Sequence, residues 1–284
     1  MRPSLHLSTM TEDLSNIHMS KAEFQEYGYR LVDWLAEYFD NVDQYQVLPS
    51  IEPGDIRKML PVSAPEGAES MDEIIADLDR VVMPGVAHWQ HPGWYAFFPS
   101  GASPVSALGE FVAAGLATQG MMWSTAPAAT EIENTVLDWL VDLLGLPPSW
   151  RLDEGPGGGV IQMSASDSTH LSLAVARHQF ELTGADANSL VAYGSSQAHS
   201  SIEKGARVAG FKHIRSVPVT QTFGIDADAF AKIVRDDIDS GLIPAWVCSA
   251  VGTTNTTAMD PIRAIAAIAS ENGMWHHADA AYAG

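Results

Sequence analysis

The chain has 284 residues, 46% of them hydrophobic and 18% charged, a globular balance with enough apolar material for one large domain or two smaller ones. Its formal net charge of −20 argues against nucleic acid and anionic membrane surfaces as partners. No apolar run approaches the roughly 18 residues of a membrane-spanning helix, and Met1–Met19 lacks the pattern of a secretory signal, so we expect a cytoplasmic protein.

Two capped helices are predicted in the N-terminal third of the sequence. Met1–Met19 is polar and irregular, and we expect a mobile arm there. Ser20 and Glu23 match a capping box, and Ser70 with Glu73 opens the next predicted helix after a proline-rich connector. Behind the first box an aromatic-rich stripe recurs at helical spacing through Phe24, Tyr27, Leu31, Trp34 and Tyr38. Such a stripe packs either on its own core or on a second subunit.

The following stretch, His88–Ser100, fits neither a helix nor a strand, because prolines interrupt it and aromatic side chains crowd within it. A helix is predicted at about Pro104–Leu116. Another begins at Ala126-Pro127, where proline suits the first turn, and ends at Gly145. Its inward face is expected to consist of four apolar residues, Ile132, Val136, Leu140 and Leu144.

Predicted strands alternate with predicted helices in the second half of the sequence. The strands are expected at Val160–Met163, Leu190–Tyr193, Lys212–Pro218, Ala245–Val251 and Met274–Ala278. The helices are expected at about Asp167–Leu182, Ser200–Ala209, Asp226–Ser240 and Pro261–Glu271. This alternation predicts an α/β fold with a mainly parallel sheet and helices on both faces. The single cysteine, Cys248, lies in a predicted strand and is expected to be a small buried hydrophobe.

Polar residues follow four of these strands, at the edge where ligands bind in open α/β sheets. Ser164–Thr169 offers hydroxyls and N–H groups at a helix start, which suits a phosphate, but simple capping by Ser166 or Asp167 explains it as well. His199, after the next strand, could stack on a flat ring or could only bond to the backbone at a helix start.

The other two strand ends carry a hydroxyl-rich loop and a carboxylate. Gly252–Thr257 is too long for a tight turn and too polar for the core. Asp279 is the one formal charge of Trp275–Gly284, and a buried carboxylate requires a partner such as a protonated heterocyclic nitrogen. The alternative is a carboxylate that caps the next turn. A phosphate at a helix start, a ring beside His199 and a carboxylate at the ring nitrogen together describe pyridoxal phosphate.

Several ordered motifs also resemble one known family. They are His91-Pro92 with Phe98-Pro99-Ser100, Trp123–Glu131, Gly158–Ser166, Gln197–Ser201, Gly252-Thr253-Thr254 and His277–Gly284. In these the chain, from about Ser20 to its end, resembles the group II pyridoxal-phosphate-dependent amino-acid decarboxylases, and among them the aromatic-L-amino-acid decarboxylases.

The resemblance implies a fold type I architecture and a homodimer with sites at the interface. Residues 1–90 would form an N-terminal helical segment that packs in the dimer, and residues 91–284 an incomplete cofactor-binding large domain. The C-terminal small domain and the family's Schiff-base lysine would lie outside this chain. We therefore expect these 284 residues alone to be inactive, although they could still bind the cofactor weakly.

The resemblance also assigns roles by position. The cofactor-binding residues would be Ser164, Ala165, Ser166, His199, Thr254, Asp279 and Ala281. Of these, His199 would stack on the pyridine ring and Asp279 would keep the ring nitrogen protonated, so both are expected to be catalytic. Ser100 would contact the substrate. Apart from the resemblance, substrate contacts are expected from Trp89, Phe97 and Phe98, because the aromatic side chains crowded in this stretch suit a flat apolar substrate. No metal site is expected.

Three positions depart from the family's pattern. Met163 stands where the phosphate loop commonly has glycine, Asp167 where glutamate is frequent, and Phe97-Phe98 where a tyrosine is common. Met163 could narrow the loop or redirect its backbone, so phosphate binding is less secure than ring binding.

The expected function is decarboxylation of an L-amino acid, most simply an aromatic one, to the corresponding amine. Alternatives within the fold are aldehyde-forming oxidative deamination, transamination and decarboxylation of an acidic amino acid, and a non-catalytic truncated paralogue is a further one. A nucleotide-dependent oxidoreductase fits badly, because Gly157–Gly159 precedes its predicted strand and no Gly-x-Gly-x-x-Gly opens a helix.

Overall fold

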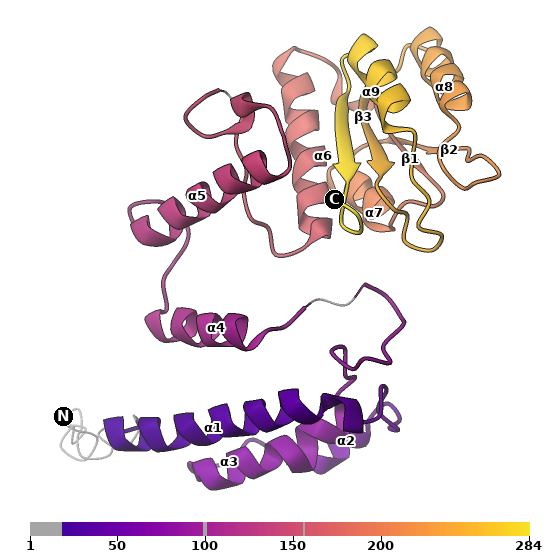
Figure 1. Cartoon of the computed structure of the whole chain (residues 1–284). Coiled ribbons are helices and arrows are strands. Elements are labelled where there is room, and N and C mark those ends of the chain that lie inside the picture. Colours follow the sequence, from indigo (N-terminus) through magenta and orange to yellow (C-terminus); the bar gives the residue numbers. More distant parts are fainter. Residues whose placement is uncertain (1–18, 99–100, 156) are drawn as a thin grey trace, which may run out of the picture. The chain divides into compact units, whose positions relative to one another are not determined.

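The computed structural model describes residues 19–98, 101–155 and 157–284, so the mobile arm expected at the N-terminus lies almost wholly outside the described residues. The described residues divide into two compact units, with the boundary between Ala117 and Thr118 (Figure 1). The boundary expected near residue 90, between a dimer-packing segment and a cofactor-binding domain, stays a prediction. None of the described helices is long and apolar enough to cross a membrane.

The first unit is helical. Its elements are α1 (Lys21–Asn41), η2 (Val42–Gln44), α2 (Asp55–Met59), α3 (Met71–Asp77), η3 (Leu78–Val82), η4 (Met83–Gly85) and α4 (Pro104–Leu116). Both predicted capping boxes are present: the Ser20 and Ser70 hydroxyls accept the N–H of Glu23 and Glu73, whose carboxylates accept the serine N–H groups in return. The local capping signals therefore fixed both helix starts.

The second unit contains α5 (Pro127–Leu143), η5 (Pro148–Trp150) and an α/β part. That part consists of α6 (Ala165–Leu182), η6 (Ala187–Ser189), β1 (Leu190–Ser195), α7 (Ser201–Val208), β2 (His213–Val217), α8 (Ala227–Asp239), β3 (Ile243–Ala250), α9 (Ile262–Glu271) and β4 (Trp275–Asp279). The four strands are all parallel, in the order β2-β1-β3-β4. The predicted α/β fold is thus confirmed, with its strands and helices close to the expected positions.

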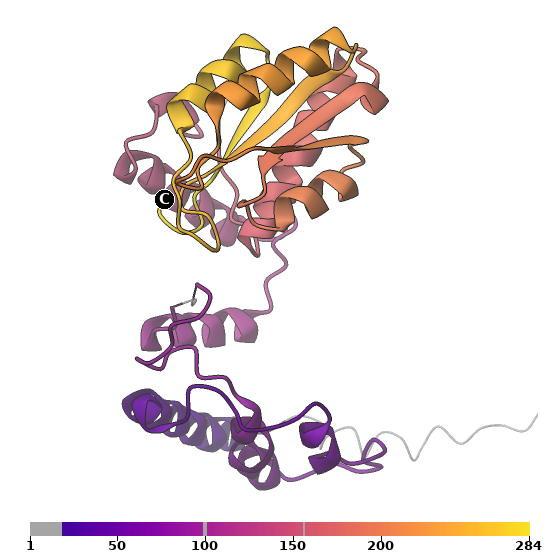
Figure 2. The ribbon, with the colours of Figure 1, turned by 90° about the vertical axis from the view of Figure 1, so that its right-hand side faces the viewer.

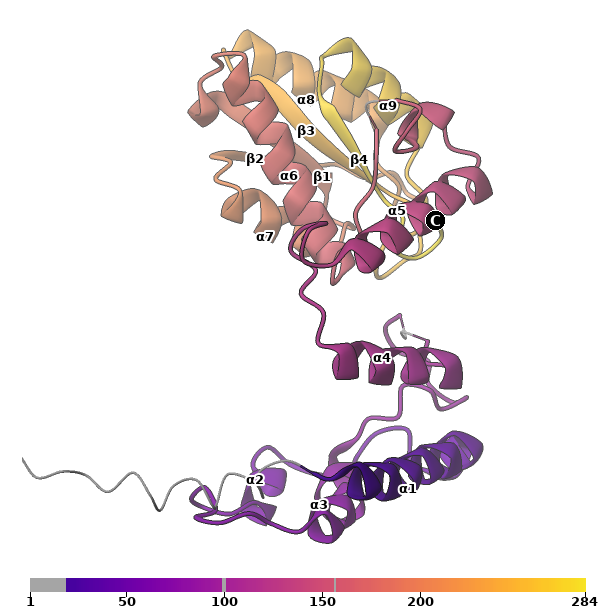
Figure 3. The same cartoon turned by 90° about the vertical axis from the view of Figure 1, so that its left-hand side faces the viewer.

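Helices cover both faces of this sheet. α6 and α7 lie on one face, where Leu173 and Ala206 pack on Trp246 and Cys248 (Figure 3). α8 and α9 lie on the other face, where Phe230 and other apolar side chains pack against the strands (Figure 2). The buried strands consist largely of apolar residues because both of their faces are covered.

The strand predicted at Val160–Met163 is absent. These residues belong to no ladder, and the Met163 side chain is 96% exposed. A strand requires a hydrogen-bonded neighbour, and in the described structure none lies beside this segment. The prediction of a strand here is therefore wrong.

The inward face predicted for α5 is wrong at three of its four positions, since only Val136 is half-buried. Ile132 is 64% exposed, and Leu140 and Leu144 are exposed as well, whereas Val141 is buried. The covered face is shifted by one residue, because the segment that packs on α5 contacts Leu137 and Glu133. Periodicity identified an amphipathic helix, but the packing partner decided which side is covered.

Candidate active site

The carboxyl ends of β1, β3 and β4 meet at one edge of the sheet, and the N-terminus of α6 reaches the same edge. Ala250 pairs with Asp279 across β3 and β4. Thr169, in the second turn of α6, has its Oγ1 3.3 Å from Nε2 of His277 in β4. The structure therefore places the predicted phosphate-binding turn and Asp279 at the same edge of the sheet, although they are more than one hundred residues apart in the sequence.

The first turn of α6 can accept an anion. Ser164 is the N-cap: its Oγ accepts the N–H of Asp167 at 3.2 Å and donates to Oδ2 of that carboxylate at 2.8 Å. The N-cap is therefore Ser164, whereas the alternative to phosphate binding expected Ser166 or Asp167 to cap the helix. Within the described residues no partner is recorded for the N–H groups of Ala165 and Ser166 or for the Ser166 hydroxyl. These donors, at the positive end of the helix dipole, suit a phosphate.

Asp279 lies on the α6 side of the sheet. It is two residues after His277, so both side chains point to the same face of β4. Burial raises the pKa of the Cys248 thiol on this face, and the Asp279 carboxylate raises it further. Oδ1 of Asp279 accepts the N–H of Ala281 at 3.2 Å, as the turn-capping alternative expected. Oδ2 has no recorded partner in the described part of the chain and is available to a ligand N–H.

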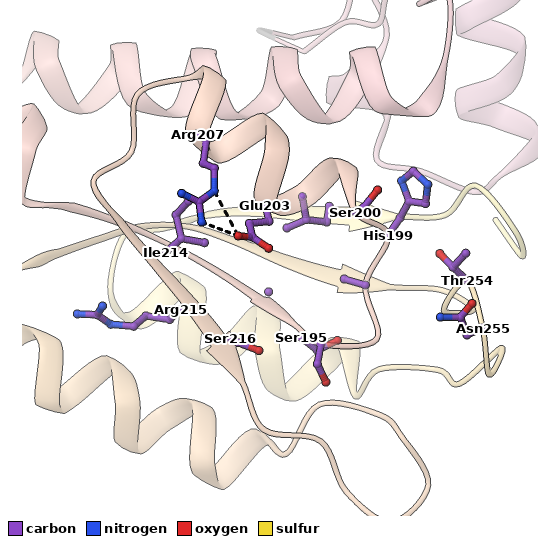
Figure 4. Close-up of a pocket in the computed structure, with 14 residues that line it drawn as sticks. Ser195, His199, Ser200, Glu203, Arg207, Ile214, Arg215, Ser216, Thr254 and Asn255 are labelled. Carbon is purple, nitrogen blue, oxygen red and sulfur yellow. Dashed lines mark hydrogen bonds and ion pairs between the residues drawn. The ribbon is translucent and has the colours of Figure 1, made fainter.

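His199 has a fixed ring orientation. Its Nδ1 accepts the N–H of Ser201 at 3.2 Å and lies 2.9 Å from the Ser201 hydroxyl. The neutral imidazole therefore carries its proton on Nε2. Nδ1 therefore bonds to the backbone at the helix start, as one of the two alternatives expected. The ring itself is exposed and lines a pocket of about 700 Å³ (Figure 4).

Thr254 lines the same pocket, on the loop after β3 (Figure 4). The neighbouring Thr253 is buried and holds the loop closed, because its Oγ1 accepts the N–H of Ala258 at 3.1 Å. Gly252 has φ +90°, and a Cβ there would come within 2.1 Å of the Tyr282 ring. Only glycine fits this backbone, which presents Thr254 to the pocket.

Comparison with known proteins identifies the family of this chain. A family model described as "Pyridoxal-dependent decarboxylase conserved domain" matches residues 53–284. The chain belongs to this decarboxylase family. The family's cofactor is pyridoxal 5′-phosphate.

Two curated relatives and one solved structure illustrate the similarity. The aromatic-L-amino-acid decarboxylase of Catharanthus roseus is 42% identical over 92% of this chain and 53% of its own length. A phenylacetaldehyde synthase of Arabidopsis thaliana is 40% identical over 94% of this chain and 55% of its own length. The crystal structure of Catharanthus roseus tryptophan decarboxylase in complex with L-tryptophan superposes with a TM-score of 0.87 at 40% identity, covering 93% of this chain and 58% of that one. The chain thus spans about half the length of the curated relatives it matches.

The residues at the sheet edge fit the family's cofactor. Two backbone N–H groups and a hydroxyl at the start of α6 match a phosphate, and one free carboxylate oxygen of Asp279 matches a protonated ring nitrogen. The flat face of His199 matches an aromatic ring. Met163 points into solvent in this structure, so its side chain leaves the first turn of α6 open.

The predicted substrate residues lie in the other unit. Trp89 stacks on Trp94, with ring centroids 4.5 Å apart, and on Phe97 at 5.8 Å. Phe97 adopts a left-handed backbone, with φ +58°, and its ring is exposed, as that of Phe98 is in part. Ser100 lies outside the described residues. The assignment of these residues to substrate binding stays a prediction.

One further carboxylate at the sheet edge carries no motif in the sequence. Asp260 is only 5% exposed, and its two oxygens accept the N–H groups of Ala250 and Ile225, each at 2.7 Å. Burial raises the pKa of this carboxyl, whereas the two bonds lower it. No short-range motif marks Asp260, because its partner Ile225 lies 35 residues earlier. Asp260 fixes the end of β3, from which the Thr254 loop departs.

The two histidines of β4 predict a loss of stability in acid. Burial lowers the pKa of His276 and of His277 below 6.5, although Asp279 partly offsets the effect at His277. Between pH 6.5 and the lower folded-state values the unfolded chain binds more protons, so the free energy of unfolding should fall as pH falls through that window. Urea unfolding at several pH values measures this. In a His276→Asn, His277→Asn double variant the free energy of unfolding should depend less steeply on pH. The control His178→Gln, at an exposed site, should keep the wild-type dependence. An unchanged pH dependence in the double variant would refute the assignment.

Proposed function

We propose that the protein decarboxylates an aromatic L-amino acid, using pyridoxal 5′-phosphate, and releases the corresponding amine. The observation that carries this proposal is the meeting of unpartnered donors at the start of α6 with a free oxygen of Asp279 at one sheet edge. The names of the relatives support the reaction class and the aromatic substrate.

In this proposal each residue has a separate task. The N–H groups of Ala165 and Ser166 bind the phosphate, with Ser164 beside them, and His199 stacks on the ring. Thr254 supports the ring from the loop after β3, and Ala281 packs beneath it, held by its bond to Asp279. When bound, the cofactor supplies an electron sink for the electron pair that remains when CO₂ leaves. Asp279 holds the proton on the ring nitrogen and so stabilises that charge.

The aromatic substrate is inferred from the N-terminal unit. No lysine or arginine occurs between Val81 and Trp150, so this stretch offers no cation to a distal carboxylate. It contains the exposed rings of Trp89, Phe97 and Phe98 instead, which suit a flat apolar side chain. We propose that these rings and Ser100 contact the substrate.

A competition assay tests the substrate class. With tryptophan, tyrosine, phenylalanine, glutamate and aspartate supplied to the holoenzyme, we expect kcat/KM for the best aromatic substrate to exceed that for glutamate by at least about 100-fold, because an apolar pocket leaves a second carboxylate unpaired. A kcat/KM for glutamate above those for the aromatic amino acids would contradict the proposal.

Aldehyde-forming oxidative deamination is a second candidate. It is favoured by the 40% identity to a phenylacetaldehyde synthase, which is close to the identity to the decarboxylase. The products separate the two: decarboxylation alone gives amine and CO₂, whereas the oxidative reaction consumes O₂ and gives aldehyde. We expect amine as the main product.

We also propose a homodimer. The rings of Phe24 and Phe111 stack 6.0 Å apart, and the apolar groove between α1 and α4, of about 500 Å³, is bordered by exposed side chains that include Val32 and Leu108. α1 has no buried residue, so a second subunit can supply the packing that this helix lacks. Sedimentation of the active protein should give a dimer; a stable, active monomer would contradict this. A cytoplasmic location remains our proposal, since the single cysteine is free and buried.

A further inference from the structure

α5 presents a carboxylate to the segment that leads into α6. Glu133, Leu137 and Val141 follow one another at intervals of four residues, so they share one face of the helix. Oε1 of Glu133 accepts the N–H of Ile161 at 2.7 Å. Leu137 contacts Gly159, where a Cβ would come within 2.9 Å of the leucine methyl. This face therefore holds the segment at two points, three and five residues before the N-cap Ser164.

The same segment has little else to hold it. It belongs to no strand, and the side chains of Val160, Ile161 and Met163 are exposed, so apolar burial does not fix its path. Upstream, Gly157 donates its N–H to the carbonyl of Ser149 at 3.1 Å. Between Gly159 and the N-cap Ser164, the bond to Glu133 is the recorded interaction that ties the described backbone to another element.

The position of Ile161 matters for the proposed phosphate site. It precedes Ser164 by three residues, and the N–H groups proposed to bind the phosphate belong to Ala165 and Ser166. A charge-assisted bond to a backbone N–H is short and directional. Fixing the Ile161 backbone thus limits the directions from which the chain can enter α6. It thereby also limits the orientation of the Ala165 and Ser166 N–H groups.

We infer that Glu133 is a positioning residue that orders the entry to α6 for binding of the cofactor phosphate. This inference rests on the proposed function, and specifically on the phosphate at the first turn of α6. Glu133 touches neither the cofactor nor the substrate in this account. Glu133 acts through the Ile161 backbone alone, so its replacement should lower the affinity only for a ligand that carries the phosphate.

The test compares pyridoxamine 5′-phosphate with pyridoxamine, which differ only in the phosphate and do not react with lysines. Each is titrated by calorimetry into the purified protein and its variants. For Glu133→Ala we expect affinity for the phosphorylated ligand to fall about tenfold, as for the loss of one charge-assisted bond. Affinity for pyridoxamine should stay within about twofold of wild type. Glu133→Gln keeps an oxygen acceptor for the Ile161 N–H and should recover most of the loss.

Glu131→Ala is the matched control. Glu131 lies two residues earlier on α5 and accepts the Trp123 indole N–H at 2.8 Å, so its removal breaks a comparable bond without touching the segment before α6. We expect wild-type affinity for both ligands. A Glu133→Ala variant that binds the phosphorylated ligand like wild type would overturn the inference. An equal loss for both ligands would overturn it as well, since a general structural role predicts that result.

Failure of the proposed function has a different signature. If the wild-type protein binds neither ligand saturably, both proposals fall. If Asp279→Ala leaves affinity for both ligands unchanged while Glu133→Ala weakens only the phosphorylated one, the nitrogen assignment fails and the inference about Glu133 stands.

Discussion

In the complete enzyme, replacing Asp279 with alanine is expected to abolish amine formation and to weaken binding of pyridoxal phosphate. The carboxylate has one oxygen held by the Ala281 N–H and the other free on the α6 side of the sheet. In the proposed mechanism the ring nitrogen would then lose the group that keeps it protonated, and the electron sink would fail. The lost charge-assisted bond alone should cost about 1.5–3 kcal/mol of cofactor binding, or roughly 10- to 150-fold in Kd.

The measurement is the rate of CO₂ release from an aromatic amino acid, together with a cofactor titration. Asp228→Ala is the control, because this exposed aspartate of α8 belongs to no part of the proposed site, and we expect wild-type values for it. Circular dichroism should show that both variants fold. Wild-type turnover with alanine at position 279 would remove Asp279 from the mechanism.

The second large effect is expected at Asp237, which joins β1, β2 and α8. Asp237 is 6% exposed; it accepts the Tyr193 hydroxyl at 3.0 Å and the Arg215 guanidinium at 3.0 Å and 2.6 Å. Burial, and then the nearby carboxylate, raises the pKa of Tyr193. Asp237→Ala leaves a buried hydroxyl and a partly buried cation without their partner. We expect the free energy of unfolding to fall by about 3 kcal/mol.

Urea unfolding measures this loss, and Asp236→Ala provides a closely matched control. Asp236 is the preceding residue, and its pair with Lys232 lies on the surface. Its removal should therefore change stability by no more than about 0.5 kcal/mol. A loss below about 1 kcal/mol for Asp237→Ala would show that this network contributes little to the fold.

Local signals explain how much of the fold was predictable. The two capping boxes and the alternation of apolar strands with amphipathic helices each depend on neighbours within a few residues, and these elements are present close to where they were expected. Val160–Met163 and the covered face of α5 depend instead on which segment lies beside them. The sequence pattern carries no information on that partner, so both predictions were wrong.

The candidate site divides in the same way. Ser164–Ser166, His199, Thr254 and Asp279 could be proposed from the sequence because each follows a predicted strand or opens a predicted helix. The structure adds that β4 and α6 bring Asp279 to the helix start. Asp260 and Glu133 were missed, since each carboxylate accepts a backbone N–H from a distant part of the chain. Such contacts leave no motif in the sequence.

A crystal structure of the protein with bound pyridoxal 5′-phosphate tests the central claim most directly. The account predicts the phosphate within hydrogen-bond distance of the Ala165 and Ser166 N–H groups, the ring nitrogen on Oδ2 of Asp279, and the imidazole of His199 stacked on the ring. A phosphate bound away from the start of α6, or a ring nitrogen that faces a group other than Asp279, would contradict it.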